Sequence, residues 1–470
     1  MYVQTQNDNK RNHQYKYINR SNSISYVMWP RLVANKILRK RSFGSNNFVA
    51  DFPIKSDTIV DSNPALSLGQ PSLSADNIFR NNHKDTQTYK IFVSTWNVGG
   101  IAPKEGFDME DWLQSTGNIC DIYVLGFQEM VPLRPSNVLG SENCKLSTKW
   151  NSLIREGLNT KIYGKQNHKN VGLTKDVSPT DGGKVPDQSY RCIISKQMVG
   201  ILISVWVRND LRHYIRHPSV SCIGCGIMGC LGNKGSVSVR FQLHETSFCL
   251  VCSHLASGGK EGDEKHRNSD VVDILTRTCF SKGHFLDLPR KILDHDRVIL
   301  FGDLNYRISL PEATTRKLVE NNEWNALLEN DQLRMELMSG QVLEGWQEGV
   351  IKFAPTYKYY PNSDVYFGFV DCKKEQKWRA PAWCDRILWY GEGLKQHQYA
   401  RGESKLSDHR PVKAIFSVEV EVLKTLKGMQ EFFRSERFGH QISNKLQISS
   451  SNHFPSNVRS SSFRIIDRDL

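Results

Sequence analysis

The sequence predicts a mixed α/β (α+β) fold whose core is dominated by β-strands. Eight apolar runs have the length and the β-branched and aromatic content of strands, and helical patterns lie between them. Hydrophobic residues make up 39% of the 470 residues and aromatic residues 10%, so the chain can form a large core and is not disordered throughout. Length alone leaves open several domains or one large domain with tails.

The strand-like runs all lie in the middle of the chain. They cover residues 89–97, 121–129, 198–208, 235–243, 248–255, 297–305, 387–391 and 409–420. Helical periodicity is clearest in residues 264–278 and 310–331, and a further helix would end at Gly340. Residues 132–188 are rich in Ser, Asn, Lys and Gly, which is typical of an elaborated surface excursion. We predict one central domain over residues 89–420 that carries this variable insert.

The two ends of the chain differ in composition from the middle. In the amino-terminal segment, residues 1–88, residues 9–50 contain no acidic residue and many basic ones. Within them, residues 29–43 have apolar residues at helical spacing and predict a basic amphipathic stretch. This stretch either lies on an anionic membrane or packs on the central domain. Residues 51–88 are interpreted as a linker, and residues 421–470 as a largely disordered tail.

Charge and hydropathy indicate the kind of partner and the cellular compartment to expect. The formal net charge of +13 favours partners with a negative surface, but it does not choose among nucleic acid, anionic lipid and small polyanions. No apolar run approaches the roughly 18 residues that a membrane span needs. The polar amino terminus also lacks the apolar core of a signal peptide. We therefore expect an intracellular, cytoplasmic protein.

The eleven cysteines predict reduced thiols, because their number is odd and they are scattered along the chain. Two pairs, Cys222 with Cys225 and Cys249 with Cys252, superficially resemble a zinc site. Cys249 and Cys252 lie in a strand-like run, where side chains three residues apart point to opposite faces and do not chelate one ion together. We interpret these cysteines as small buried hydrophobic residues.

Several apolar runs begin or end with a polar residue that a buried strand does not favour. The polar residues at the carboxyl ends of their runs are Asn97, Glu129, His254 and Asp303. Those at the amino ends of their runs are Asp385 and His409. One such residue is explained as a turn residue, but six of complementary chemistry indicate a site. In an antiparallel sheet the ends of some strands and the beginnings of others share one edge, so we expect these side chains to converge. Carboxylates hold a hard cation, amides orient water, and a His beside an acid donates to a phosphoryl oxygen.

Signatures of other phosphoryl-transfer enzymes are missing or misplaced. No cysteine is followed six positions later by Arg, as a cysteine-dependent phosphatase requires. Residues 294–298 fit the letters of an aspartyl-phosphate motif, but they precede a strand instead of following one. Lys234 lies between Asn233 and Gly235, so its Gly-rich turn is not the Gly-Lys-Ser/Thr loop of a nucleotide site. Direct attack by water remains, and Lys234 either faces a phosphate or belongs to a purely conformational turn.

Seven motifs together resemble the inositol polyphosphate 5-phosphatases. In the order of that family they are WNVGG at 96–100, QE at 128–129, GNKGS at 232–236, SHL at 253–255, GDLNYR at 302–307, AWCDRIL at 382–388 and SDHRPV at 407–412. The resemblance covers about residues 89–420. The segments SKQMVGI and CLGNKGSVSV are similar in sequence to the plant, type I-like branch of the family. It implies the DNase-like endonuclease/exonuclease/phosphatase fold, a four-layer β-sandwich flanked by helices.

The resemblance also implies roles for the polar residues at the strand ends. Glu129 would bind Mg²⁺ with Asn97 close by and Asp408 near the metal. Asp303 and Asn305 would orient and deprotonate the attacking water. This assignment is chemically coherent, because the metal offsets charge on the phosphoryl oxygens while positioning and electrostatics do most of the work.

A second set of residues would bind the substrate. His409, held by Asp385, would contact the scissile phosphate, and His254 would provide a second contact to it. The Gly-rich turn would present Asn233 and Lys234. The neighbouring 4-phosphate would be bound by Tyr357, Lys358, Lys377 and Arg379, since cations beside an aromatic residue suit a polyphosphorylated ring.

The predicted function is removal of the 5-phosphate from inositol polyphosphates or phosphoinositides, such as Ins(1,4,5)P₃ and PtdIns(4,5)P₂, in phosphatidylinositol dephosphorylation and signalling. A nuclease is the main rival, because its superfamily shares the metal, Asn, Asp and His. A non-catalytic phosphoinositide-binding protein is a second rival, although it would have no need for every catalytic group. We expect a monomer with no nucleic-acid partner, and leave contact with anionic membranes open.

Overall fold

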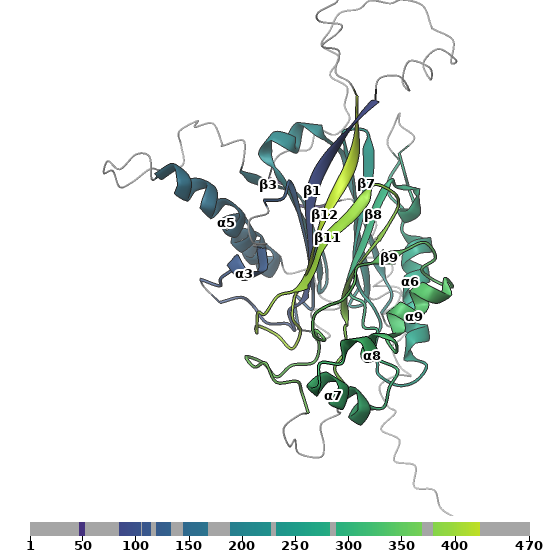
Figure 1. Cartoon of the computed structure of the whole chain (residues 1–470). Coiled ribbons are helices and arrows are strands. Elements are labelled where there is room, and N and C mark those ends of the chain that lie inside the picture. Colours follow the sequence, from purple (N-terminus) through teal and green to yellow (C-terminus); the bar gives the residue numbers. More distant parts are fainter. Residues whose placement is uncertain are drawn as a thin grey trace, which may run out of the picture.

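Two six-stranded β-sheets stack face to face in this computed structural model, with helices on both outer faces (Figure 1). The structure describes residues 47–51, 84–104, 106–113, 119–132, 144–167, 189–226, 232–282, 288–368 and 379–423. The first sheet contains β1 (Lys84–Asn97), β2 (Ile122–Gln128), β3 (Tyr190–Met198), β4 (Ile201–Arg208), β11 (Leu394–Arg401) and β12 (Val412–Leu423). The second contains β5 (Ile215–Gly224), β6 (Gly235–Leu243), β7 (Thr246–His254), β8 (Arg297–Asp303), β9 (Gln347–Glu348) and β10 (Asp385–Tyr390).

The helices surround this sandwich. The α-helices are α3 (Glu110–Leu113), α5 (Lys145–Asn167), α6 (Asp263–Arg277), α7 (Glu312–Glu320), α8 (Trp324–Leu328) and α9 (Gln332–Ser339), and η1 (Asn209–Tyr214) and η3 (Ile292–Asp294) are short 3₁₀ turns. Figure 1 shows α3 and α5 outside the first sheet and α6 and α9 outside the second. The four-layer arrangement expected from the sequence is therefore confirmed.

The main core lies between the sheets, and the alternation of side chains along each strand builds it. In β1, Val93 faces the inner core with residues such as Leu250 and Phe301 of the second sheet. The neighbouring Phe92 and Trp96 face outward and pack under α5. A central strand such as β1 therefore supplies two apolar layers, which explains why its run has few polar positions.

The outer layers are also well packed. Trp150 and Ile154 of α5 are fully buried against the first sheet. The prediction that residues 132–188 form only a surface excursion is therefore wrong for the helical part, because its apolar side completes the core. On the other side, Val271 and Ile274 of α6 cover the second sheet.

The eight predicted strands are all present, but four strands were not predicted. These are β3, β5, β9 and β11, which have weaker apolar alternation or are very short. The single helix predicted over residues 310–331 is divided into α7 and α8, because Asn322 between them takes a left-handed conformation with φ of 58°. Gly340 ends α9 as predicted, with φ of 66°.

The strand directions explain why the polar strand ends meet. β1 and β2 are parallel, β7 and β8 are parallel, and β10 is antiparallel to β8. The ends of four strands and the beginnings of β10 and β12 therefore lie at one end of the sandwich. The strand ends were expected to converge through antiparallel pairing, and they do converge, but parallel pairs contribute as well, because both sheets are mixed.

Cys249 and Cys252 are buried on opposite faces of β7, as the spacing predicted, and Cys252 faces the inner core while Cys249 faces α6. Among the described residues no helix is long and apolar enough to cross a membrane. The predictions for residues 29–43, for residues 52–83 of the linker, for the tail beyond residue 423 and for Lys377 lie outside the described residues.

Candidate active site

Asp303 lies at the centre of the polar residues at the end of the sandwich. It is the last residue of β8 and is paired in register with His254, the last residue of the parallel strand β7. His254 Nε2 lies 3.3 Å from Asp303 Oδ2, and Asn97 Nδ2 donates a hydrogen bond to the same oxygen at 2.9 Å. Gly302 permits this close pairing, because a Cβ there would lie 1.9 Å from the carbonyl oxygen of Ser253.

Asn305 follows Asp303 in a tight, left-handed turn with φ of 58°. Its backbone N–H donates to Asp303 Oδ1 at 3.1 Å, and its Nδ2 donates to the carbonyl oxygen of Leu255 at 3.1 Å. Both Asp303 and Asn305 are buried. The turn therefore fixes the carboxylate and the amide relative to each other.

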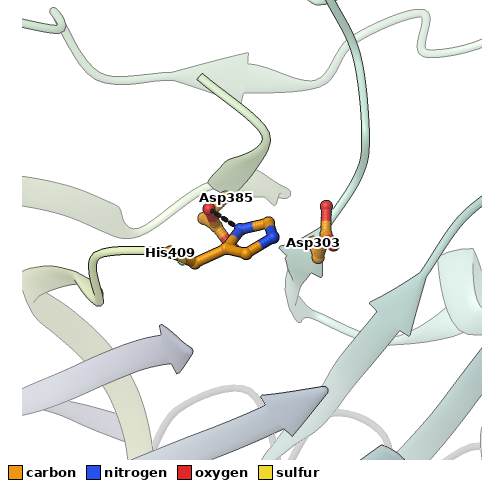
Figure 2. A group of neighbouring side chains, drawn as sticks. All are labelled: Asp303, Asp385 and His409. Carbon is orange, nitrogen blue, oxygen red and sulfur yellow. Dashed lines mark hydrogen bonds and ion pairs between the residues drawn. The ribbon is translucent and has the colours of Figure 1, made fainter. Parts of the chain in front are cut away.

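Asp385 and His409 form a buried acid–imidazole pair beside Asp303. His409 Nδ1 donates to Asp385 Oδ2 at 2.9 Å, and Thr356 Oγ1 donates to the same oxygen at 2.7 Å. Ligand atoms of Asp303, Asp385 and His409 all lie within 4.8 Å of one another. Figure 2 shows the imidazole ring between the two carboxylates. The two residues lie on different elements: Asp385 is in β10, and His409 is in the loop before β12.

The charges of these groups follow from their surroundings. Burial alone would lower the pKa of His409, but the carboxylate of Asp385 raises it to about 9. Burial alone would raise the pKa of Asp303, but the hydrogen bond with His254 and the charge of His409 hold it well below its usual range. At neutral pH the site therefore contains an imidazolium at His409 and a carboxylate at Asp303.

His254 and Lys234 form a second polar pair on the other side of Asp303. Lys234 Nζ lies 2.5 Å from His254 Nε2. Burial and then the charge of Lys234 lower the pKa of His254. Burial also lowers the pKa of Lys234, although Asp303 and Glu129 oppose this change. Next to it, Asn233 Oδ1 is buried and makes no hydrogen bond within the described part of the chain.

Oxygen atoms suited to a hard cation gather near Asn97. Glu129 is left-handed with φ of 50°, and its Oε1 lies 3.8 Å from His254 Nε2. Gly99 N–H donates to Asn97 Oδ1 at 3.0 Å, and a Cβ on Gly99 would lie 3.4 Å from Asp408 Oδ1. The Asn97 amide oxygen and the Asp408 carboxylate therefore border the turn at Gly99, while the Glu129 carboxylate lies toward His254. Oxygen donors of this kind suit a hard cation such as Mg²⁺ or Ca²⁺. In contrast, Asp385 Oδ2 is already engaged by His409 and Thr356, whereas Asp385 Oδ1 is buried and makes no hydrogen bond within the described residues.

Three of the four residues predicted for the 4-phosphate are described. The Tyr357 ring packs on the His409 ring with centroids 4.5 Å apart, and Lys358 Nζ lies 3.4 Å from Asp408 Oδ2. Arg379 is anchored by its carbonyl oxygen, which accepts a hydrogen bond from Arg316. The structure brings Tyr357 and Lys358 into contact with the site. Burial raises the pKa of Tyr357 to about 12, and the charge of Arg379 opposes this rise only slightly.

Two further residues belong to this arrangement and were not predicted. Arg307 is buried, donates to Asn305 Oδ1 at 2.6 Å and lies over the Tyr357 ring at 4.6 Å from its centroid. Thr356 supports Asp385, as described above. Arg307 lies in the motif GDLNYR, and Thr356 directly precedes the predicted Tyr357, so both were near recognised residues, but no role was predicted for either.

Comparison with known proteins identifies relatives of this chain. Residues 94–415 match the family model described as endonuclease/exonuclease/phosphatase family 2. The chain is similar to type IV inositol polyphosphate 5-phosphatase 9 of Arabidopsis thaliana, with 64% identity over 88% of this chain and 97% of that protein. It is 48% identical to type I inositol polyphosphate 5-phosphatase 8 of the same plant, over 84% of this chain and 86% of that protein.

A solved structure shows the same fold. It is the inositol polyphosphate 5-phosphatase domain of SpSynaptojanin in complex with inositol (1,4)-bisphosphate and a calcium ion. The two chains are 29% identical with a TM-score of 0.60, and the match covers 80% of this chain and 97% of that domain.

Proposed function

The chain belongs to the inositol polyphosphate 5-phosphatases, and on this premise we propose that it hydrolyses the 5-phosphate of inositol polyphosphates and phosphoinositides by direct attack of water. One observation carries the chemistry: the Asp303 carboxylate lies between the His409–Asp385 pair and the His254–Lys234 pair. The Asp303 carboxylate, which can act as a base, therefore has on each of two sides a pair of groups that can bind the negatively charged oxygens of a phosphate. This is the arrangement that in-line phosphoryl transfer to water requires.

Asp303 accepts the proton of the attacking water in this proposal. Its pKa is held low, so it is ionised at neutral pH, and Asn97 and Asn305 N–H fix its two oxygens. A fixed carboxylate restricts the water to one direction of approach, which lowers the entropic part of the barrier. Asn305 holds the water through its amide, whose own orientation is set by Leu255 and Arg307.

His409 binds an oxygen of the scissile phosphate as an imidazolium, and His254 with Lys234 binds another. Asp385 keeps His409 charged and correctly turned, because it occupies Nδ1 and leaves Nε2 for the substrate. Positive charge that is already in place stabilises the transition state without reorganisation during the reaction. The buried oxygen of Asn233 would gain a partner in the substrate or in bound water.

Glu129, Asn97 and Asp408 would hold a divalent cation, and we propose Mg²⁺. When bound, the ion supplies charge stabilisation for the phosphoryl oxygens. The carboxylate and amide oxygens near Gly99 support this proposal, since hard cations prefer oxygen ligands. The related SpSynaptojanin domain was solved with a calcium ion, another hard cation.

Tyr357, Lys358, Lys377 and Arg379 would bind the neighbouring 4-phosphate and so define the substrate. The contact between Tyr357 and His409 supports this role, because it joins the aromatic wall directly to the scissile-phosphate site. Lys358 lies beside Asp408, so one cation borders both the proposed metal site and the substrate. A nuclease would not need this set.

The decisive experiment measures phosphate released from Ins(1,4,5)P₃ by the full chain with Mg²⁺, and identifies the product by phosphorus NMR. The expected product is Ins(1,4)P₂. Release of another phosphate, or nicking of plasmid DNA without phosphate release, would overturn the proposal. Headgroup chemistry is shared by soluble and lipid substrates, so the same assay is repeated on PtdIns(4,5)P₂ vesicles to separate them.

We also propose that the protein acts as a monomer inside the cell, in the cytoplasm. None of the nine described cysteines forms a disulfide, and six of them are buried, which suits a reducing compartment. Sedimentation analysis of the full chain and localisation of a tagged protein test the two statements.

A further inference from the structure

Gln332 is the first residue of α9 and lies outside all the motifs recognised in the sequence. Its side chain is buried, and its Oε1 accepts two hydrogen bonds, from Arg307 N–H at 2.9 Å and from Arg267 Nη2 at 2.7 Å. Because both partners are donors, the amide must point its oxygen toward them. Gln332 is therefore a buried acceptor between α6, which carries Arg267, and the turn that carries Asn305.

The backbone of Arg307 is held at both of its polar groups. Its N–H donates to Gln332 Oε1, and its carbonyl oxygen accepts from Gln332 N–H at 2.9 Å. The next residue, Ile308, forms a β-bridge with Asp331. The chain that follows Asn305 is therefore fastened to the beginning of α9 by two adjacent residues.

This fixed backbone directs the guanidinium of Arg307 into the site. Arg307 Nη2 donates to Asn305 Oδ1 at 2.6 Å, and Arg307 Nε donates to the carbonyl oxygen of Asn305 at 3.0 Å. The same guanidinium covers the Tyr357 ring, which packs on the His409 ring. Because the guanidinium is a rigid planar fork, its position sets the positions of both groups that it contacts.

The beginning of α9 is itself firmly anchored. Asp331 Oδ1 caps the helix by accepting from Arg334 N–H at 2.9 Å, and both oxygens of Asp331 accept from Arg386 Nη1 at 2.9 Å. The Asp331 and Arg386 side chains are fully buried, and Arg386 follows Asp385 in β10. Gln332 is therefore supported by a rigid element that is also joined to the strand carrying Asp385.

We propose that Gln332 is a positioning residue for the hydrolysis: it holds Arg307, and through Arg307 it fixes the amide of Asn305 against the attacking water. The amide bonds to Leu255 through Nδ2 and to Arg307 through Oδ1, so each atom keeps a further bonding position for water. Reacting atoms must stay about 3–3.5 Å apart, so a small displacement of this amide lowers the rate. The proposal rests on the proposed function, in which Asn305 holds that water.

Two substitutions separate the acceptor from the volume of the side chain. Gln332→Met has a similar size but no acceptor, so it leaves the N–H of Arg307 and the guanidinium of Arg267 each without a partner in a buried place. Gln332→Glu keeps an oxygen at the same reach, and its negative charge lies close to the cation of Arg267. The first variant should release Arg307, and the second should hold it.

The test measures kcat and KM for Ins(1,4,5)P₃ with Mg²⁺ in the full chain for Gln332→Met, Gln332→Glu and Gln341→Met. Gln341 is exposed on the loop after α9 and controls for loss of an amide. The change Gln332→Met is also measured in an Arg307→Lys background. Circular dichroism checks folding, and if Gln332→Met is unfolded, Gln332→Asn takes its place, because its amide is one methylene shorter.

A further readout does not depend on activity. The side-chain amide signals of Asn305 are followed by ¹H–¹⁵N NMR in asparagine-labelled protein and are assigned by their loss in Asn305→Asp. They should shift in Gln332→Met and stay in place in Gln341→Met.

We expect Gln332→Met to lower kcat by about 10- to 100-fold, with KM as in Gln341→Met, and Gln332→Glu to recover most of this loss. In the Arg307→Lys background the change should cost little more, because the two residues act through one group. An unchanged kcat, a higher KM at unchanged kcat, or losses that multiply independently would overturn the proposal. If the natural chain releases no phosphate, the proposed function fails, and the Asn305 signals still decide whether Gln332 positions the amide.

Discussion

His409 Nδ1 donates a hydrogen bond to Asp385 Oδ2 at 2.9 Å, and both side chains are buried. Burial would lower the pKa of His409, but Asp385 raises it to about 9. The stabilisation from the charged pair is therefore fully present below the ordinary His value and is lost as pH rises through about 9. Phosphate release that needs the imidazolium should fall over the same range.

Asp385→Asn should move this alkaline limb to lower pH, because the neutral amide no longer favours the imidazolium. The measurement is the initial rate of phosphate release at saturating Ins(1,4,5)P₃ across the alkaline range. Asp364→Asn is the matched control, since Asp364 is 65% exposed and pairs with Lys405. If the limb stays in place in Asp385→Asn, His409 is not the group that titrates.

Asp303→Asn should reduce kcat by about 10²- to 10⁴-fold, as expected for loss of a general base. The amide keeps a similar shape, so the fold should persist, which far-ultraviolet circular dichroism checks. Asp303 titrates far below neutral pH, so the natural enzyme should show no loss of activity from this group as pH falls toward neutrality. Near-normal turnover in Asp303→Asn would contradict the assignment.

Glu129→Gln should raise the Mg²⁺ concentration needed for half-maximal activity, because one anionic ligand of the proposed site becomes neutral. Chelation should abolish activity of the natural chain, and added Mg²⁺ should restore it. Glu261→Gln serves as a control, because Glu261 is exposed on the loop before α6. An unchanged Mg²⁺ requirement in Glu129→Gln would place the ion elsewhere.

Arg379→Ala should raise KM for inositol phosphates that carry a 4-phosphate more than for those without it. The backbone at this position is held by Arg316 through the carbonyl oxygen, so removal of the side chain leaves that contact in place. Arg334→Ala, on the exposed side of α9, controls for a general loss of positive charge. Equal effects on the two substrates would point to a structural role for Arg379.

Arg386→Leu should lower the free energy of unfolding by about 3–5 kcal/mol, because it leaves two buried carboxylates without their cation. Arg386 is fully buried and binds Asp331 at 2.9 Å and Glu348 at 2.5 Å. Lys405→Ala breaks an exposed ion pair and should cost about 1 kcal/mol or less. Denaturant unfolding of both variants gives the comparison, and similar small losses would disprove a structural role for Arg386.

The position of the site was predictable because apolar runs identify the strands, and polar residues at the ends of those runs identify the site. Asp303 and His254 each follow an apolar run, and a charged or titratable residue is uncommon at the end of a buried strand unless it has a functional role. The predicted motif GDLNYR also contains Arg307, yet its contact with Tyr357 joins residues that are 50 positions apart. Nothing in the local pattern indicates which distant ring an arginine will cover.

The sequence by itself determined eight of the twelve described strands, the strand-end residues and the chemistry that those residue types allow, because these depend on local periodicity and side-chain type. Only the tertiary structure decided that two mixed sheets share the site, that Thr356 holds Asp385, and that Val49 pairs with Ser195 of β3. Those facts depend on pairing between distant segments. Strand pairing is selected by burial and backbone hydrogen bonding over the whole chain. The sequence of one segment alone does not specify the segment with which it pairs.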